Sequence, residues 1–433
     1  MSTPEQHRQG ARQGPASGRR VLVIGAGRGQ TGLIRAVRRL GATAVVATRV
    51  EPHLPGIAEA DEVLAADILA VDDVVDAARQ AGVDAVATSC LDTGLEALGA
   101  VADTLGLRGL SRQAARLCSD KLAMKKRLAQ AGVPTAAYVA VSSCEQVGPA
   151  LERTGLPAVV KATDLQGSSG VFMVDTPQEA AQAWSTAASL SRSGRVIIER
   201  LLTGREFGAQ AFVHDDQVLH VTVHGDDLAP GEVPVPVGHH VPMEADPGLL
   251  EQADRVVRQA VSALGLRNCA VNVDLMECDG VVHLIELTGR AGANGLPELM
   301  STVYGLDYYE MVAREALDLD VLETWRGRSP WDGAALAIML IDADARGTVT
   351  GIHRPDRLPG WVTDLQVFTN VGDVLEGFTS SNDCLGQVVV RGSTLAECRE
   401  RAAYIDAQVV LATDNAGTGA RTGETVSTPG TRS

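Results

Sequence analysis

The sequence has few aromatic residues, a deficit of basic residues and no long apolar run. Phe, Trp and Tyr make up 3 % of the 433 residues, so large interfaces built on aromatic anchors are not expected. Lys and Arg number 38 against 54 for Asp and Glu, and the net charge of −16 disfavours nucleic-acid and membrane partners. No stretch approaches the roughly 20 apolar residues of a membrane-spanning helix.

Cysteine usage and the start of the chain point to a reducing compartment. The seven cysteines lack CxxC spacing, which indicates neither a disulfide framework nor a zinc site. The histidines show no HxH or HxxxH pattern on one predicted element, which also disfavours zinc. The first 19 residues contain no apolar run of the kind a signal peptide needs. We therefore expect a cytoplasmic location.

The remaining composition predicts about three domains of an α/β protein. With 45 % hydrophobic residues, the chain can bury several cores at roughly 150 residues each. Apolar strands at 21–27, 44–48 and 84–90 alternate with helical segments, which predicts a parallel sheet. The predicted order is a disordered tail (1–19), an α/β domain (20–109), a central domain (110–330), a β-rich domain (331–415) and a second disordered tail (416–433).

Within the central region, periodicity and turn residues predict individual elements. We expect one helix over 111–132, a hairpin of 157–164 with 171–174, a strand pair of 196–202 with 205–213, a long loop over 225–248 and two antiparallel strands within 269–290.

A glycine-rich turn follows the first predicted strand. Gly25, Gly27 and Gly32 resemble the GxGxxG pattern that binds a pyrophosphate at a helix start. The third glycine is displaced from the expected spacing, because position 30 is Gln. A tight structural turn between strand and helix is therefore favoured over dinucleotide binding.

Two lysines and a polar loop suggest phosphate binding. Lys121 begins a helical stretch after Asp120, and Lys161 ends a strand, so each ammonium could reach a nucleotide phosphate. The alternative for Lys161 is an ordinary edge-strand position. The loop Gln166, Gly167, Ser168, Ser169 and Gly170 offers N–H and hydroxyl groups to phosphate oxygens, although alone it is also a common hairpin tip.

Four carboxylates and an arginine complete the pattern. Glu199 and Glu206 flank a glycine, where main-chain groups suit an adenine and Glu206 suits ribose hydroxyls. Asp274 and Glu286 face each other across a predicted turn among apolar neighbours, which favours a shared Mg²⁺. In the alternative, Arg290 forms a structural salt bridge with one of these two carboxylates.

Taken in this order, the motifs resemble the ATP-grasp superfamily, over about residues 20–330. The resemblance implies an α/β fold with an N-terminal doubly wound domain, a two-subdomain nucleotide-binding region whose lid spans about 136–200, and a small C-terminal β-rich α+β domain. It also implies site residues. ATP would contact Lys121, Lys161, Gln166, Gly167, Ser168, Ser169, Gly170, Glu199, Arg200, Leu202 and Glu206, and the metal would contact Asp274, Glu286 and Thr288.

Within the superfamily, the GHHVP segment (238–242), the stretch 286–307 and the C-terminal region most resemble carboxylate–amine ligases of the L-amino-acid ligase type. That resemblance implies Arg290 and Lys161 as catalytic residues and His239, Arg290 and Asn294 as substrate contacts. For His239 a solvated loop position is the alternative. Thr288 departs from the pattern, since the family carries asparagine there, and a hydroxyl is a weaker Mg²⁺ ligand.

The predicted function is an ATP-dependent ligase that joins a carboxylate to an amine, both from amino acids, through an acylphosphate, with ADP and phosphate as products. ATP and Mg²⁺ are the expected cofactors, Mn²⁺ is an expected substitute, and a homodimer is the expected assembly. Two alternatives stay open: an ATP-grasp carboxylase acting with bicarbonate, and a nucleotide-binding regulatory protein with a degenerate site.

Overall fold

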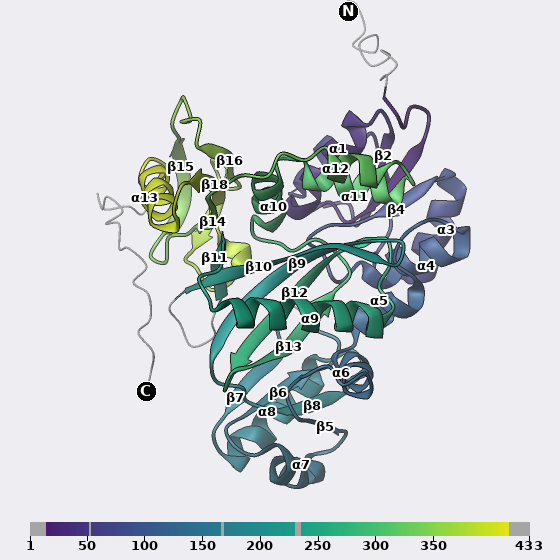
Figure 1. Cartoon of the computed structure of the whole chain (residues 1–433), viewed down its shortest axis with the longest axis vertical. Helices are drawn as coiled ribbons and strands as arrows, with labels where there is room; N and C mark the ends of the chain where they lie inside the picture. Colours follow the sequence, from purple (N-terminus) through teal and green to yellow (C-terminus); the bar gives the residue numbers. More distant parts are fainter. Residues whose placement is uncertain (1–13, 52, 166–168, 230–234, 415–433) are drawn as a thin grey trace, which may run out of the picture. The chain divides into compact units, whose positions relative to one another are not determined.

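The computed structural model describes residues 14–51, 53–165, 169–229 and 235–414. These residues form two compact units (Figure 1). The first unit comprises Met1–Thr222, Ala245–Ala291 and Tyr309–Val321, and the second comprises Val223–Glu244, Gly292–Tyr308 and Leu322–Ser433. Within the described residues, no helix is both long and apolar enough to cross a lipid bilayer. The predicted domain boundaries near 109 and 330 stay predictions.

The first unit begins with a four-stranded parallel sheet of order β3-β2-β1-β4. Its central strands are almost fully buried, as expected for a parallel sheet covered on both faces. This confirms the predicted strand and helix alternation. The elements are β1 (Arg20–Ile24), α1 (Arg28–Arg39), β2 (Thr43–Thr48), α2 (Pro55–Glu59), β3 (Glu62–Ala65), α3 (Val71–Ala81), β4 (Ala85–Ala87) and α4 (Leu95–Leu105).

The predicted tails fall partly outside the described residues, at 1–13 and 415–433. For residues 14–19 the prediction of a disordered tail is wrong. Ala16 is fully buried, and its N–H donates to the carbonyl of Leu40 at 2.9 Å. This segment therefore packs beside the end of α1. All seven cysteines are free thiols.

The predicted single helix over 111–132 is two helices, α5 (Arg112–Ser119) and α6 (Lys121–Gln130). The chain breaks at Asp120, whose backbone is extended and whose carboxylate accepts hydrogen bonds from the N–H groups of Leu122 and Ala123, both at 3.0 Å. Aspartate is a strong helix N-cap because its oxygen satisfies N–H groups that lack helical partners. The break makes Lys121 the first residue of α6.

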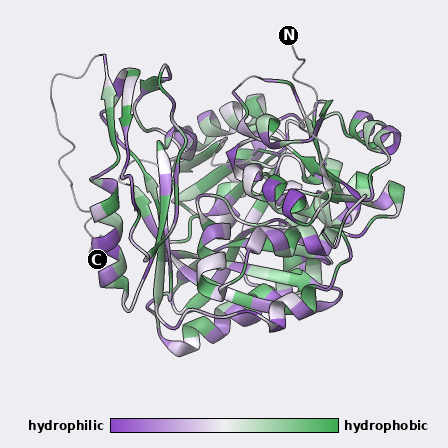
Figure 2. Ribbon diagram, turned by 90° about the horizontal axis from the view of Figure 1, so that it is seen from above, coloured by the Kyte–Doolittle hydropathy of each residue, from purple (hydrophilic) through white to green (hydrophobic). Residues whose placement is uncertain are grey.

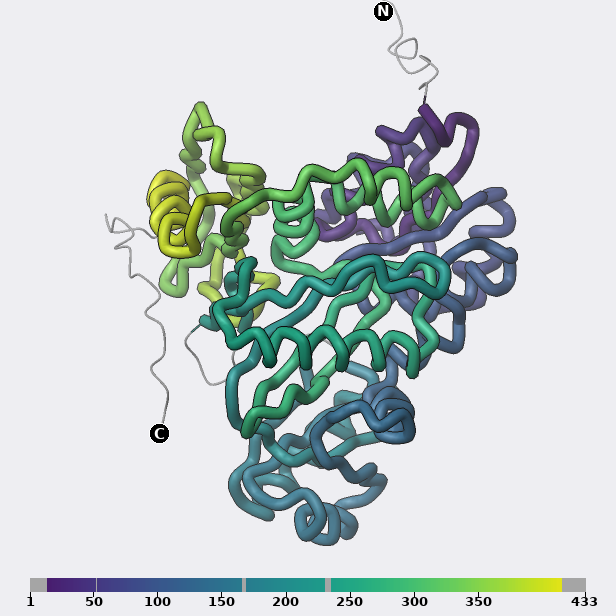
Figure 3. The backbone as a smooth tube through the Cα atoms, viewed as in Figure 1, coloured from purple at the N-terminus to yellow at the C-terminus, as the bar shows by residue number. Residues whose placement is uncertain are grey.

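A second sheet of the first unit has the order β5-β8-β6-β7. The β6 and β7 strands form the predicted antiparallel hairpin. The predicted pairing of 196–202 with 205–213 is wrong, because β8 pairs with β5 and β6. Figure 3 traces the backbone through these strands and the helices between them. The elements are β5 (Tyr138–Val141), η1 (Cys144–Gln146), α7 (Val147–Thr154), β6 (Ala158–Ala162), β7 (Val171–Val174), α8 (Pro177–Leu190) and β8 (Val196–Arg200).

The third group of strands in the first unit carries the predicted metal residues. Antiparallel β12 (Cys269–Cys278) pairs on one side with β13 (Val281–Thr288) and on the other with β9 (Arg205–His214). The register places Asp274 directly opposite Glu286, as predicted. Helix α9 (Pro247–Leu264) contacts β13, and α11 (Tyr308–Ala316) follows later in the chain. Strand β10 (Gln217–Ala229) follows β9 and continues into the second unit.

In the second unit, β10 is followed across an antiparallel sheet by β11 (Val235–Val241), β14 (Ala334–Leu340), β18 (Gly386–Gly392) and β16 (Val362–Val367). The prediction of a long loop over 225–248 is therefore wrong for the residues that belong to β10 and β11. The β-rich character predicted beyond residue 331 is confirmed. The other elements are α10 (Leu296–Tyr304), α12 (Val321–Arg326), β15 (Arg346–His353), β17 (Val374–Glu376), η2 (Ser381–Asp383), α13 (Leu395–Asp406) and β19 (Val410–Thr413).

The sheet of the second unit has chemically different faces. One face carries Leu336, Val388 and Val390, which are buried in a core with Cys398 and Ala402 of α13. Since side chains alternate along a strand, His239, Ala337 and the residues opposite them lie on the other face. In the hydropathy colouring of Figure 2, apolar green and polar purple residues are interspersed along the helices, whereas several strands carry long green stretches.

The glycine-rich turn between β1 and α1 has contacts that favour a structural turn over a dinucleotide-binding loop. Gly25 has a positive φ of 91°, and the Gly27 N–H is already bonded to the Gln30 side chain at 2.8 Å. A Cβ on Gly32 would lie 2.3 Å from the ring of Tyr309. Close packing of α1 thus accounts for this glycine.

We expect Gly32→Ala to lower the free energy of unfolding by about 1–3 kcal/mol, because an extra methyl group is forced into a packed site. Gly148→Ala is the matched control, since Gly148 also lies in a helix but has nothing within 4 Å of an added Cβ. It should raise stability by about 0.5–1 kcal/mol. Calorimetric unfolding measures both, and a Gly32→Ala protein as stable as wild type would contradict the packing argument.

Candidate active site

Lys121 lies at the start of α6 and is held by two oxygen acceptors. Its Nζ donates to Glu286 Oε1 and to the Leu165 carbonyl, both at 2.8 Å. Burial disfavours the charged ammonium, but the charge and hydrogen bond of Glu286 outweigh burial and raise the pKa of Lys121. The Lys121 backbone N–H also donates to the carbonyl of Thr163 at 2.9 Å, just beyond β6. Lys121 is therefore a fixed cation beside a predicted metal ligand.

Lys161 lies in β6, between β8 and β7, so the edge-strand alternative is wrong. Its Nζ is 3.3 Å from Oε2 of Glu199, a residue of the neighbouring strand β8. The same carboxylate oxygen lies 3.1 Å from Nζ of Lys125. One carboxylate thus holds two lysines from a strand and from a helix.

Lys125 was missed by the sequence reasoning. Its side chain and that of Glu199 are each only 2 % exposed, and Lys125 Nζ also donates to Thr135 Oγ1 at 2.7 Å. The available signal was its spacing, four residues after Lys121 and on the buried side of α6. Burial lowers the pKa of Lys125 despite the attraction of Glu199.

Glu199 retains an acceptor atom without a partner. Burial opposes its charge, but Lys161 and Lys125 outweigh burial and hold the pKa of Glu199 below its ordinary value. Among the described residues, no hydrogen-bond donor reaches its buried Oε1. A buried acceptor left unsatisfied is costly, so this oxygen is well suited to a ligand N–H.

The predicted metal residues occupy neighbouring positions of β12 and β13. Asp274 is paired with Glu286, and Asn272 with Thr288, so these side chains share one region of the sheet. Asn272 donates to Asp274 Oδ1 at 3.3 Å and accepts from Gln210 of β9 at 2.6 Å. This chain of amides, which orients Asp274, was not anticipated from the sequence.

These residues fit a hard divalent cation. Two carboxylates and a hydroxyl are the oxygen ligands that Mg²⁺ takes, usually with phosphate oxygens completing its shell. Within the described part of the chain, the buried Thr288 Oγ1 has no hydrogen-bond partner. An unpartnered hydroxyl beside two carboxylates is consistent with a position that a cation completes.

Arg290 is buried, and its guanidinium is held by Asp92 in the segment after β4. Nε and Nη2 donate to the two carboxylate oxygens, both at 2.6 Å, and Nη1 donates to the Ala291 carbonyl at 3.1 Å. The alternative that paired Arg290 with Asp274 or Glu286 named the wrong partner. Burial disfavours the charge, but Asp92 outweighs burial and raises the pKa of Arg290. Within the described part of the chain, these bonds use three of the five N–H groups and leave two.

The predicted adenine and ribose positions follow β8. The Arg200 N–H donates to the Ala137 carbonyl at 2.9 Å, so this donor is not available to adenine and only the carbonyl of Arg200 remains. Leu202 is half-buried in the connection to β9, and Glu206 is half-buried in β9 opposite Met276.

Part of the predicted phosphate loop lies outside the described residues, namely Gln166, Gly167 and Ser168. Ser169 is exposed. Gly170 has a positive φ of 67°, and its carbonyl accepts from the Ala162 N–H at 3.0 Å. Gly170 therefore closes the hairpin in a conformation that glycine adopts without strain.

His239 and Asn294 belong to the second unit. His239 is a buried residue of β11, 4 % exposed, so the solvated-loop alternative is wrong. Asn294 is half-buried with φ of 57° and precedes Gly295, the N-cap of α10. An added Cβ on Gly295 would lie 3.1 Å from the Ala337 side chain, and Ala337 is paired with His239.

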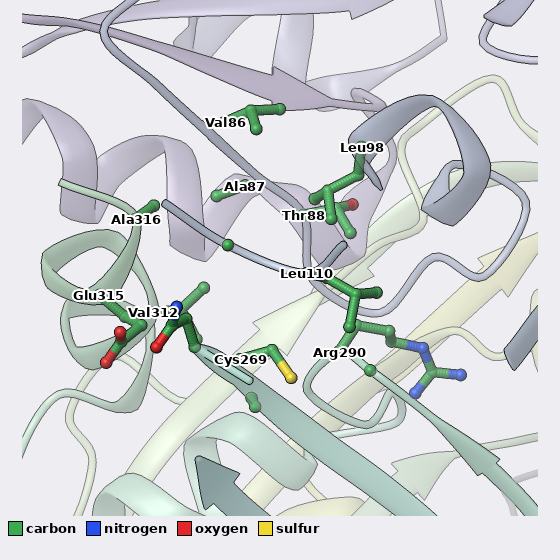
Figure 4. A pocket seen from close by; sticks show the side chains of 14 residues that line it. Val86, Ala87, Thr88, Leu98, Leu110, Cys269, Arg290, Val312, Glu315 and Ala316 are labelled. Atoms are coloured by element: carbon green, nitrogen blue, oxygen red, sulfur yellow. The ribbon is translucent and has the colours of Figure 1, made fainter. Parts of the chain in front are cut away.

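A small pocket of the first unit touches Arg290 but not the lysines. It measures about 30 Å³, enough for one or two waters, and Val86, Leu110 and Val312 contribute to its lining. Figure 4 shows the Arg290 guanidinium directed away from Glu315 on the other side of this pocket. The pocket is too small for a nucleotide.

Comparison with known proteins identifies the family. Residues 119–227 match the family model of the phosphoribosylglycinamide synthetase ATP-grasp (A) domain. The crystal structure of phosphoribosylglycinamide synthetase from Anaerococcus prevotii superposes with a TM-score of 0.80 and 37 % identity, covering 91 % of this chain and 99 % of the other. The chain belongs to the ATP-grasp family of ATP-dependent ligases. The predicted ATP-grasp fold is thereby confirmed.

Other similarities of this ATP-grasp ligase concern its C-terminal region and relatives of lower identity. Residues 340–414 match the L-amino acid ligase C-terminal domain 2. The formate-dependent phosphoribosylglycinamide formyltransferase of Burkholderia lata is 27 % identical over 413 residues, covering 89 % of this chain and 94 % of that protein. The alanine–anticapsin ligase of Bacillus subtilis is 26 % identical over 277 residues, covering 58 % and 56 % respectively.

We expect Glu199→Gln to lower the free energy of unfolding by about 3–5 kcal/mol, because it leaves two buried ammonium groups without their shared carboxylate. Glu152→Gln is the control, since Glu152 is exposed on α7 and should change stability by less than about 0.5 kcal/mol. Urea unfolding compares the two variants. Equal stability of Glu199→Gln and wild type would show that the three charges are well hydrated.

Proposed function

We propose that this ATP-grasp ligase joins the carboxylate of one amino acid to the amine of another through an acylphosphate, releasing ADP and phosphate. The observation that carries the proposal is the contact of Lys121 Nζ with Glu286 at 2.8 Å, beside the paired Asp274. This contact supports the proposal because an ammonium group lies beside the carboxylate pair to which we assign the metal ion. Such an arrangement suits the transfer of a terminal phosphoryl group, which depends on positioning and charge neutralisation.

The residues take the following roles in the proposal. Lys121 and Lys161 bind the phosphates of ATP, and Glu199 Oε1 accepts a hydrogen bond from the adenine amino group. The substrate carboxylate attacks the γ-phosphorus, so that ADP leaves and an acylphosphate forms. The amine then attacks the acyl carbon, phosphate leaves, and the nitrogen loses a proton. The free N–H groups of Arg290 stabilise negative charge on the acylphosphate.

Asp274, Glu286 and Thr288 would hold Mg²⁺ in this proposal. When bound, Mg²⁺ supplies neutralisation of the phosphate oxygens. Glu206 binds the ribose hydroxyls, and the residues of the 166–170 loop cover the phosphates. His239 and Asn294 as substrate contacts, the homodimer and the cytoplasmic location stay predictions.

Amino acids are favoured as substrates because the C-terminal residues 340–414 match an L-amino acid ligase domain. A second candidate is favoured by the 37 % identity with phosphoribosylglycinamide synthetase. In that case the ligase would join glycine to a phosphoribosylamine. Both candidates share the acylphosphate route and differ in the amine.

The deciding experiment is a panel in which ADP and phosphate are measured with ATP, Mg²⁺ and each amino acid singly and in pairs. Further arms contain glycine with phosphoribosylamine, formate, and bicarbonate. We expect phosphate release only with a carboxylate and an amine together, in equal amount to an amide product. Lys161→Ala should lower this turnover by at least about 100-fold, and exposed Lys126→Ala should not.

AMP and pyrophosphate as products would overturn the proposed chemistry. Dependence on bicarbonate would select the carboxylase alternative. Nucleotide binding without turnover in any arm would select the regulatory protein with a degenerate site.

The metal assignment predicts opposite effects for two substitutions. Thr288→Asn should keep or raise Mg²⁺ affinity, since an amide carbonyl is a better ligand for a hard cation than a neutral hydroxyl. Glu286→Gln should lower it, since a full negative charge is lost. Mg²⁺ titrations of ATP turnover compare both variants with wild type, and parallel Mn²⁺ titrations test the substitute. If Glu286→Gln titrates like wild type, the carboxylate pair is structural.

A further inference from the structure

Two histidines and an aspartate meet on one face of the sheet in the second unit. His224 and Asp226 are two residues apart on β10, so their side chains share a face. His239 of β11 stands directly opposite Asp226 in the antiparallel register. The sequence analysis predicted a loop over 225–248, so it did not bring these residues together; the pairing of β10 with β11 does.

The three side chains are buried and close. One oxygen, Asp226 Oδ1, lies 2.8 Å from Nδ1 of His224 and 2.6 Å from Nδ1 of His239. All three ligand atoms lie within 4.8 Å of one another. The side chains of His224, Asp226 and His239 are 2 %, 9 % and 5 % exposed, respectively. The cluster is therefore shielded from solvent.

Hydrogen bonding within the chain leaves this cluster incomplete. A carboxylate only accepts, so each Nδ1 must carry the proton of its bond to Asp226, and each Nε2 is left as an acceptor. In the described part of the chain, the buried Nε2 atoms of His224 and His239 have no hydrogen-bond partner. Buried polar networks that serve only to stabilise a fold are normally satisfied throughout. The atoms that meet are Nδ1 of each histidine and Oδ1 of Asp226, so a cation bound among them would displace the two Nδ1 protons, and each Nε2 would carry the ring proton instead.

We propose that His224, Asp226 and His239 form a binding site for a first-row divalent transition-metal ion such as Zn²⁺. Two imidazoles and one carboxylate are a common ligand set for such ions and leave a coordination position open. Bonds of about 2.0–2.1 Å in tetrahedral geometry place ligand atoms roughly 3.3 Å apart. The two contacts of Asp226 Oδ1 with the histidine nitrogens, at 2.8 and 2.6 Å, would lengthen toward that spacing when a metal ion takes the place of the protons.

This site is distinct in chemistry from the Mg²⁺ position of the proposed function and does not depend on it. Mg²⁺ prefers oxygen ligands in octahedral geometry, whereas imidazole nitrogen favours the later transition metals. The opposite face of the strands has other partners: Asp227 is bonded by both terminal nitrogens of Arg399, at 2.8 and 2.9 Å. His240, next to His239, points to that opposite face.

The test uses the full chain, stripped with a chelator and kept reduced, without nucleotide and with excess Mg²⁺. Zn²⁺ affinity is measured by competition with a chromophoric chelator, and Co²⁺ provides a visible spectrum of the site. We expect one tightly bound Zn²⁺ per chain. Asp226→Asn and His239→Gln should each weaken binding by more than about 100-fold, beyond the effect of losing an outer-shell partner.

His240→Gln is the matched control, because it removes a buried imidazole at the adjacent residue and should leave Zn²⁺ affinity unchanged. Zn²⁺ should also raise the unfolding temperature of wild type but not of Asp226→Asn, which separates lost binding from lost folding. Wild type that binds no more Zn²⁺ than Asp226→Asn would overturn the proposal. Binding lost equally in His240→Gln would overturn it as well. Neither result bears on the proposed ligase function.

Discussion

The interior of the first unit holds buried charges of opposite sign that must compensate one another. Glu199 shares one carboxylate oxygen with Lys125 and Lys161, and both Lys125 and Glu199 are almost completely buried. Charges removed from water are stable only when opposite charges and hydrogen bonds replace hydration. The strand β8 must therefore lie beside β6, and α6 must present Lys125 toward both.

The register of the β12 and β13 hairpin supplies the second constraint. The Asp279 and Gly280 turn adopts positive φ values of 52° and 77°, and the strands that leave it bring Asp274 opposite Glu286. Glu286 in turn binds Lys121. Helix α6 thus carries both sets of contacts, since Lys121 pairs with Glu286 and Lys125, one turn later, pairs with Glu199.

Sequence patterns predicted the local elements better than the contacts between them. The hairpin register could be anticipated, because the spacing around a short turn fixes which residues face each other. The partner of Arg290 could not, since Asp92 lies almost 200 residues earlier and only the fold brings the two together. Lys125 looked like an ordinary helix residue, and β10 and β11 were hidden by prolines and glycines that suggested a loop.

The hydrogen bond from the Lys121 backbone to the Thr163 carbonyl has a mechanical consequence. It fastens the first residue of α6 to the chain just past Lys161, so the two lysines stand on a common frame. The backbone separation of the two lysines is thus set by the fold itself, before any ligand binds.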